Sequence, residues 1–574
     1  MNNTPDVSLQ PKAPKDPVKK SQSFFILRNK DVAAMPLDDG SFVQFVFLTD
    51  GRLVSSAKLA GGIEDEEELN LLKTTEGLRK LVAQIGVSVE TDEPDDEVKF
   101  CFHMYGNKDL YGSGTKIITN IRCDGSEKLI ELDKVDWSDD DKEPGQFRFD
   151  FKKAGIIGKA TVRFYLNDGY TAPVQEEEDP VDTSLKAYAD MIDNSVVSYG
   201  NNARIKRALK KARAGEDVTV AFIGGSITQG AGAIPINTEC YAYKTFKGFC
   251  ELAGKGTDEN IHYVKAGVGG TPSELGMLRY ETDVLYDGKV VPDIVVVEFA
   301  VNDAGDETGG RCYDSLVQMI YNGPGSPAVI LLFAVFQDDF NLEERLSPVG
   351  FGYNLPMVST KKCVTKQFYL KASEGRVVSK NQFFYDCFHP TNIGHTIMAD
   401  GILKLFKDID KAPEDEEIKT LKDIKPPIGA QFSNVKLLDK KHKPVKADIS
   451  EGDFTHTDKQ VQCVERNMDL TVSPEFPDNW MYKGGSNRPF AMDIDCKSLL
   501  IIYKDSADPN AATAKVYADG ELRLTIDPKI IGWTHANPFI VFEETETKRH
   551  HIEVKMKDGF ENGEFTICGF GVVE

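Results

Sequence analysis

The sequence contains no apolar run of 18 residues, and residues 1–21 lack the apolar core that a signal peptide requires. Both absences argue against a membrane-spanning helix and a secretory leader. The ten cysteines form no CxxC pair and no regular framework, which disulfide-rich secreted domains would show. The sequence therefore predicts a cytoplasmic protein, or a secreted one whose leader has been removed.

Positive charge is also scarce. Lysine and arginine number 68 against 91 aspartates and glutamates, which gives a formal net charge of −23. Nucleic acids and anionic membranes attract basic surfaces, so this balance excludes both as the main partner. The charge is compatible with a neutral substrate such as a sugar, and no feature of the sequence indicates the oligomeric state.

Hydrophobic patterning changes along the 574 residues, which are too many for one core. Short runs of alternating polar and apolar residues, separated by Gly, Asp and Asn turns, predict two antiparallel β-sandwiches. Between them, continuous apolar runs alternate with helix-length segments, which is typical of a parallel sheet covered on both faces. The expected boundaries are 1–22 for a disordered tail, 23–175 for an N-terminal accessory β-sandwich, 176–217 for a linker and leading helix, 218–420 for the α/β domain and 421–574 for a C-terminal β-sandwich.

Several elements can be predicted individually. A leucine stripe indicates one helix over residues 66–85, and the turn Ala518-Asp519-Gly520-Glu521 between alternating runs indicates a β-hairpin. In the α/β domain, the expected strands cover residues 218–223, 263–268, 293–300 and 328–336, and the expected helices cover 241–252, 273–285, 314–321 and 391–406.

The stretch over residues 218–232 is the centre of the α/β domain. Its apolar and β-branched strand stops at Gly224 and Gly225, and Ser226 follows at once. A strand that breaks on glycines and presents a hydroxyl at its carboxyl end exposes a nucleophile in many α/β enzymes, because glycines permit a tight turn. A phosphate-binding turn or a plain loop between strand and helix would have the same pattern.

Three further motifs occur near the carboxyl ends of predicted strands or before the last helix, where ligands of parallel sheets bind. Gly270 lies in a glycine-rich turn, and Asn302 ends an apolar strand. Asp386 and His389 belong to the third of these motifs, just before the last helix. Acyl transfer needs a nucleophile, a base, a group that orients the base, and donors for the oxyanion. Ser226 is the expected nucleophile, His389 the base, and Asp386 the carboxylate that orients it. The backbone N–H groups of Ser226 and Gly270 and the amide of Asn302 are the expected oxyanion donors.

Each motif alone has a simpler explanation, since DxxH pairs and strand-end asparagines are common in turns. Asp386, His389 and His395 would be an alternative metal site, but no third histidine or cysteine cluster lies nearby. The sequence therefore predicts no metal and no cofactor. His395, one turn into the last helix, is expected to pack or cap rather than to bind a ligand.

Taken together and in this order, the four motifs over residues 216–408 resemble the SGNH (GDSL-like) hydrolases, a family named for a serine, a glycine, an asparagine and a histidine. The resemblance implies a flavodoxin-like three-layer α/β/α domain. It also implies a Ser226–His389–Asp386 triad, with Gly270 and Asn302 as the glycine and asparagine of the oxyanion hole.

Two positions depart from the family pattern. Gly225 stands where relatives usually have aspartate, and Ala300 stands where they have glycine. Neither change removes a catalytic group, and the Gly-Gly-Ser-Ile-Thr form is similar to that of carbohydrate-esterase branches. With two flanking β domains, the chain resembles multidomain acetyl esterases. The resemblance thus implies a serine esterase that removes O-acetyl groups from plant-type oligosaccharides or polysaccharides.

Two tryptophans are candidate sugar-binding residues. Trp480 and Trp533 lie in polar segments with Gly or Pro, where an exposed indole can stack on a sugar ring. Packing at a domain interface is the alternative for each. Three other functions remain open: a lipid or thioester acylhydrolase of the same fold, a non-catalytic carbohydrate-binding protein, and a transferase that moves acetyl groups between sugars.

Overall fold

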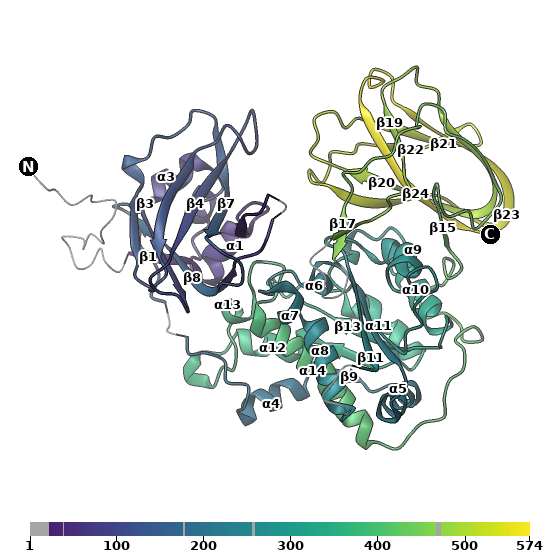
Figure 1. The fold of residues 1–574 in the computed structure, drawn as a ribbon, viewed down its shortest axis with the longest axis horizontal. Coiled ribbons are helices and arrows are strands. Elements are labelled where there is room, and N and C mark those ends of the chain that lie inside the picture. Colours follow the sequence, from purple (N-terminus) through teal and green to yellow (C-terminus); the bar gives the residue numbers. More distant parts are fainter. Residues whose placement is uncertain (1–21, 38, 176–177, 255–258, 466–471) are drawn as a thin grey trace, which may run out of the picture.

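The computed structural model describes residues 22–37, 39–175, 178–254, 259–465 and 472–574. The predicted disordered tail, residues 1–22, lies outside this range except for Gln22. Figure 1 shows a β-rich part in purple at the left, an α/β part in teal and green, and a second β-rich part in yellow-green above the α/β part. No helix among the described residues has the length and apolar character needed to cross a bilayer.

The α/β part is built on a six-stranded sheet in the order β11-β10-β12-β13-β14-β9. Five strands are parallel, as expected, and the short edge strand β9 is antiparallel to β14. Strands β9 and β14 have three residues each, which is too few to leave a recognisable pattern. The bounds are β9 Val196–Ser198, β10 Val218–Gly224, β11 Ile261–Gly267, β12 Ile294–Glu298, β13 Ala328–Phe333 and β14 Met357–Ser359.

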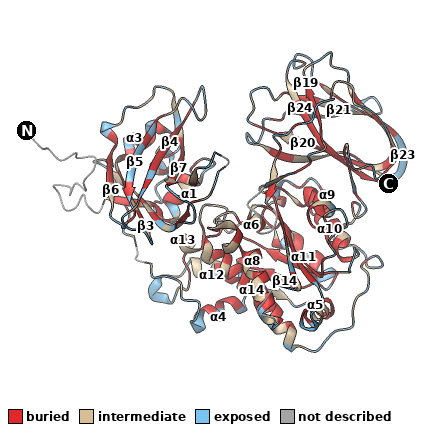
Figure 2. Ribbon diagram, viewed as in Figure 1, coloured by how far each residue is buried: buried red, intermediate tan, exposed pale blue. Residues whose placement is uncertain are grey.

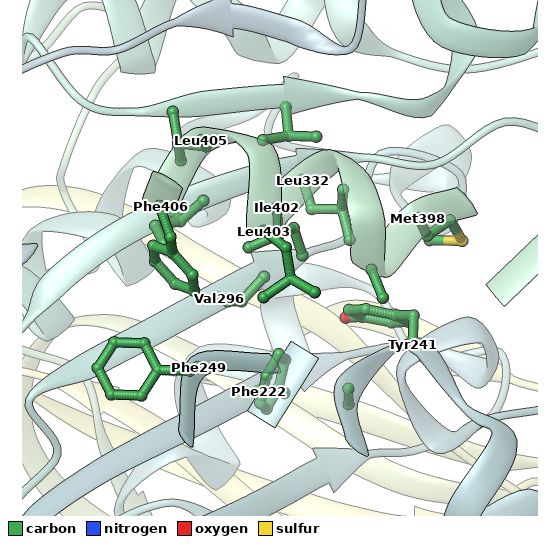
Figure 3. Packing of buried hydrophobic residues seen from close by; sticks show 14 of the residues in the cluster. Phe222, Tyr241, Phe249, Val296, Leu332, Met398, Ile402, Leu403, Leu405 and Phe406 are labelled. Carbon is green, nitrogen blue, oxygen red and sulfur yellow. The ribbon is translucent and has the colours of Figure 1, made fainter. Parts of the chain in front are cut away.

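Helices pack against both faces of this sheet, because successive side chains of a strand point to opposite sides. Phe222, Val296 and Leu332 pack on one face against helices that include α8 and α14, as Figure 3 shows. Ile223 and Val297 pack on the other face. The helices of the first face are α4 Lys186–Asp193, α5 Ala203–Ala214, α8 Tyr241–Leu252, α12 Thr360–Phe368 and α14 Asn392–Lys411; those of the second are α9 Ser273–Asp283, α10 Arg311–Tyr321 and α11 Glu343–Gly352.

The N-terminal part contains two four-stranded antiparallel sheets that share one hydrophobic core, visible as buried strands in Figure 2. The first has the order β1-β8-β3-β6 and the second β2-β7-β4-β5. Helix α1, Arg52–Leu59, follows β2. The strands are β1 Ser23–Ala33, β2 Phe42–Phe47, β3 Val82–Thr91, β4 Glu97–Gly106, β5 Lys116–Arg122, β6 Lys128–Glu131, β7 Asp141–Phe151 and β8 Ile157–Leu166.

The prediction of one helix over residues 66–85 is wrong. The segment forms two short helices, α2 Glu66–Leu71 and α3 Thr75–Leu81, and strand β3 begins at Val82. The side chain of Thr74 accepts a hydrogen bond from the N–H of Gly77 and so caps a new helix start. The leucine stripe is real, but it belongs to two helices and the following strand.

The C-terminal part contains an eight-stranded sheet dominated by the long strands β20 Phe490–Asp505 and β23 His535–Met556, and β17 and β18 form a separate two-stranded sheet. The predicted hairpin is confirmed: β21 Ala514–Ala518 and β22 Glu521–Ile526 pair, with Asp519 and Gly520 at φ 54° and 82°. Leu500 and Ile502 of β20 belong to the same hydrophobic cluster as helices α9 and α10, so this part is packed directly onto the α/β part. The other strands are β15 Lys436–Leu438, β16 Ala447–Ser450, β17 Cys463–Glu465, β18 Val472–Pro474, β19 Trp480–Lys483 and β24 Glu564–Val573.

Candidate active site

The predicted site residues meet at the carboxyl edge of the central sheet. Ser226 follows β10, and the turns that carry Gly270 and Asn302 follow its two neighbours, β11 and β12. All three residues line one cleft of about 900 Å³, together with Asp386 and His389. The structure thus brings together five residues that the sequence separates by up to 163 positions.

A hydrogen-bonded chain joins three of these side chains. The Oγ of Ser226 lies 3.0 Å from Nε2 of His389, and Nδ1 of His389 lies 2.9 Å from Oδ2 of Asp386. Because an ionised carboxylate only accepts, Nδ1 carries the proton and Nε2 accepts from the serine hydroxyl. Asp386 Oδ1 also accepts from the backbone N–H groups of Phe388 and His389, each at 2.8 Å. These bonds hold the imidazole in one orientation.

A cation from another part of the chain completes this arrangement. Arg52, on helix α1 of the N-terminal part, donates from Nε to Oδ2 of Asp386 at 3.2 Å, and its guanidinium lies over the ring of Phe388. Burial alone raises the pKa of Asp386, but the contacts with His389 and Arg52 outweigh it and hold that pKa well below its usual range. The carboxylate is therefore ionised near neutral pH.

Sequence reasoning did not find Arg52, since its partner lies 334 residues away. It also missed Arg279, a fully buried residue of α9. The Arg279 guanidinium donates to the carbonyls of Gly224 and Ala266, each at 2.7 Å, and so ties together the ends of β10 and β11. A charged residue within the apolar run Met277-Leu278-Arg279-Tyr280 is the signal that could have indicated this role.

Gly224 and Gly225 leave no room for a side chain. Gly225 has φ −85° and ψ −148°. A Cβ at Gly224 would overlap Thr228, and a Cβ at Gly225 would overlap the side-chain amide of Asn302. The missing aspartate of the family pattern thus leaves room for the asparagine that follows β12.

A second close approach seats the loop that carries His389. Gly232 has φ +87°, and a Cβ there would overlap the carbonyl of Pro390. Beside it, the side chain of Asn392 accepts from the N–H of Ile234 and donates to its carbonyl, both at 2.7 Å. The segment after Ser226 and the segment after His389 are therefore locked together.

His395 has a structural role, as expected. It is fully buried, stacks on Tyr241, and its Nδ1 accepts from the N–H of that residue at 3.2 Å. Its Nε2 lies 3.1 Å from the carbonyl of Ala231. Burial lowers the pKa of His395 to about 3, so the ring remains neutral.

A buried carboxyl lies directly behind the serine turn. Glu298, the last residue of β12, is fully buried and accepts from the hydroxyl of Thr228 at 3.0 Å. Burial raises its pKa to about 8, and the hydrogen bond from Thr228 only partly opposes this shift. The group is therefore largely protonated near neutral pH.

This raised pKa makes stability depend on pH. Because the unfolded chain releases the Glu298 proton at a lower pH than the folded chain, its contribution to stability is complete below about pH 4.5 and is lost as pH rises through about 8. The loss is up to about 1.4 kcal/mol per pH unit in this window.

We expect the calorimetric Tm of Glu298→Gln to match that of the wild type near pH 5 and to exceed it near pH 8. Glu344→Gln, at an exposed position on α11, is the matched control; a Tm difference that does not grow with pH would contradict the prediction.

The two candidate tryptophans differ. Trp533 is 44% exposed and lines the cleft, beside Gly270 and the ring of His535. Trp480 is 1% exposed and packs against Phe490 in the core of the C-terminal part, so its prediction as a substrate-binding residue is wrong. The polar segment around it continues into strand β19, which turns the indole inward.

Three parts of the chain form the walls of the cleft. The N-terminal part contributes a large share, which includes Phe45, Phe47, Arg52 and Tyr111. The C-terminal part contributes Ile531, Gly532 and Trp533. The serine, histidine and asparagine thus share one cleft with residues of both flanking parts.

Comparison with known proteins gives a match for the fold. No family model and no curated protein matches the sequence. Among solved structures, a two-domain esterase active on acetylated mannans, co-crystallised with mannopentaose, superimposes with a TM-score of 0.54 at 23% identity. A second structure of a two-domain esterase active on acetylated mannans matches with the same TM-score at 24% identity.

The chain shares the fold of these esterases. The match covers 67% of this chain and 98% or 99% of the other two. The mixed α/β architecture with additional sheets is therefore that of a known esterase scaffold, although the shared scaffold does not by itself assign an activity. The remainder of this chain has no counterpart in those two structures.

Proposed function

We propose that the protein is a serine esterase that removes O-acetyl groups from carbohydrates. The observation that carries this proposal is the hydrogen-bonded chain from Ser226 through His389 to Asp386, in one cleft with Gly270 and Asn302. A nucleophile, a base in contact with it and a carboxylate that orients the base are the requirements for acyl transfer.

In the proposed reaction, Ser226 Oγ attacks the acetyl carbonyl while Nε2 of His389 takes its proton. The negative charge on the carbonyl oxygen is stabilised by the N–H groups of Ser226 and Gly270 and by the amide of Asn302. His389 then returns the proton to the departing sugar hydroxyl. Water, activated by the same imidazole, releases acetate and restores the serine. No step needs a metal or a cofactor.

Arg52 has a positioning role in this proposal. The imidazolium that forms during the reaction needs an ionised Asp386 beside it. The guanidinium of Arg52 supports that ionisation in a buried place, where an unpaired carboxylate would be costly. The N-terminal part thus stabilises the ionised Asp386 as well as forming a wall of the cleft.

We also propose the finer architecture that the family resemblance implies. The flavodoxin-like three-layer α/β/α domain expected over residues 218–420 also includes α4, β9 and α5, which belong to its sheet or to the core on its first face, and β-sandwich domains extend over 23–175 and 421–574. The hydrophobic clusters on both faces of the central sheet and the shared core of the two N-terminal sheets support this division.

The assignment to acetylated carbohydrates has two supports. The cleft is lined by aromatic rings, such as Trp533, and by polar groups, such as Asp50 and Glu143, and this mixture suits a sugar better than an acyl chain. The esterases that share the fold are described as active on acetylated mannans.

Two substrate series test the proposal. Acetate release is measured with acetylated mannan, xylan, xyloglucan and pectin oligosaccharides, and a set of 4-nitrophenyl esters compares acyl chains from acetyl to octanoyl. We expect release from at least one glycan and a preference for acetyl over octanoyl of at least about tenfold in kcat/KM. The opposite preference would indicate a lipid or thioester acylhydrolase. No turnover and no labelling of Ser226 by an organophosphonate would indicate a carbohydrate-binding protein.

A further inference from the structure

The outer face of the sheet β2-β7-β4-β5 in the N-terminal part carries an unusual set of side chains. Alternate residues of these strands, such as Phe100 and Phe147, fill the core between the two sheets. The residues between them line a groove of about 450 Å³ on the outer face. This groove contains Phe45, Phe47, Tyr111, Gln146, Arg148 and Asp150.

The groove continues into the cleft that holds Ser226. Phe45, Phe47 and Tyr111, hereafter the aromatic shelf, line both. Phe47 is 50% exposed and Tyr111 is 58% exposed. The rings of Phe45 and Phe47 are stacked at 6.1 Å with an angle of 14°. Large aromatic side chains left exposed beside a reactive cleft indicate a place where a ligand lies.

Polar groups surround the aromatic shelf. Arg148 donates to Asp150 at 2.6 Å and also lies over the ring of Phe45. Gln146 accepts from the hydroxyl of Tyr105 at 3.3 Å. The Nε2 of His103, which lines the groove, is buried and has no hydrogen-bond partner in the described part of the chain. Aromatic faces with hydrogen-bonding groups at their edges match a sugar ring, which presents C–H groups on its face and hydroxyls around its rim.

We propose that the aromatic shelf binds pyranose rings of a glycan chain whose acetylated residue lies in the cleft. This inference rests on the proposed function, because a glycan is expected in the groove only if the substrate bound in the neighbouring cleft is an acetylated glycan. The shelf stacks against the rings, and the polar groups around it bind their hydroxyls. Lys99 and Lys116 also line the groove, and Lys99 lies 3.7 Å from Asp150, so charged as well as neutral polar groups are available to sugar hydroxyls.

Binding and turnover test the inference separately. The full chain carrying Ser226→Ala is titrated by calorimetry with mannohexaose, xylohexaose, cellohexaose and hexagalacturonate, none of them acetylated. We expect at least one hexaose to bind, and the further changes Phe47→Ala and Tyr111→Ala to weaken that binding by at least about tenfold. Ile157→Ala removes a side chain of similar exposure from the other sheet and is the matched control. A Tm near that of the parent verifies the fold of each variant.

Turnover provides the second readout, with Ser226 restored. The ratio of kcat/KM for an acetylated hexaose to that for an acetylated monosaccharide is expected to exceed one in the wild type. It should fall at least about tenfold in the double variant, and Ile157→Ala should leave it unchanged.

Three results would overturn the inference. The first is that no hexaose binds, and the second is that the double variant binds a hexaose as tightly as its parent. The third is that the protein binds no glycan but forms a concentration-dependent dimer that the double variant no longer forms. The last result would identify the face as a protein interface. If hexaoses bind the aromatic shelf but no acetate is released, the proposal that the aromatic shelf binds glycans is upheld and the proposal of an esterase fails.

Discussion

Replacing Ser226 by alanine is expected to lower kcat for acetate release by about 10⁴-fold or more. The change removes the Oγ that lies 3.0 Å from His389 Nε2 and that forms the acyl–enzyme bond in the proposed reaction. Alanine keeps the Cβ, so the turn after β10 retains its packing. Acetate release is measured under saturating substrate, and the Tm is expected to stay near that of the wild type.

Two comparisons make this result specific. Ser126→Ala changes an exposed serine of the N-terminal part and should leave kcat unaltered. An organophosphonate should label the wild type and the Ser126→Ala variant but leave Ser226→Ala unlabelled. If Ser226→Ala kept a rate close to that of the wild type, the nucleophile would have to be another group and the assignment of the whole hydrogen-bonded chain would fail.

The second large effect is expected at Gly225. A single methyl group there would overlap the amide of Asn302, which would have to move away from the serine turn. Displacing one oxyanion donor typically lowers the rate by about 10²–10³-fold, so Gly225→Ala should reduce kcat by about 10²-fold with a smaller change in KM. Gly225→Asp, which restores the residue usual in the family, should reduce kcat further because its side chain is larger.

Gly305 provides the control for this prediction. It lies three residues after Asn302, and an added Cβ would meet no atom within 4 Å. Gly305→Ala should therefore have kcat close to the wild-type value. Were Gly225→Ala as active as Gly305→Ala, the amide of Asn302 could move without consequence, and it would not be a donor to the oxyanion.

Much of the central sheet could be predicted, because long elements leave strong patterns. Helix α8 has the predicted bounds, Tyr241–Leu252, and the strands that precede Ser226, Gly270 and Asn302 lie where continuous apolar runs indicated. The four motifs also converge as expected, since neighbouring parallel strands present their carboxyl ends at one edge.

The predictions that the structure contradicts, and the features that the sequence did not indicate, have physical causes. Strands β9 and β14 are too short to have a period, and the helix predicted over residues 66–85 ran through the cap at Thr74 into a strand. The polar neighbours of Trp480 make a surface position one of two interpretations of the sequence, but tertiary packing decides the direction of a side chain and buries this indole. The pairing of Arg52 with Asp386 spans 334 residues, and no local pattern can indicate such a contact.

That pairing changes what counts as the smallest working unit of this protein. A chain cut before α4 would retain all four motifs and every group that contacts the acetyl ester in the proposed reaction. It would nevertheless leave the carboxylate behind His389 without its cation, and it would remove the wall that carries Phe47 and Tyr111. Reactivity and access to the cleft therefore both depend on the docking of the N-terminal part, so motif content alone does not define a minimal enzyme here.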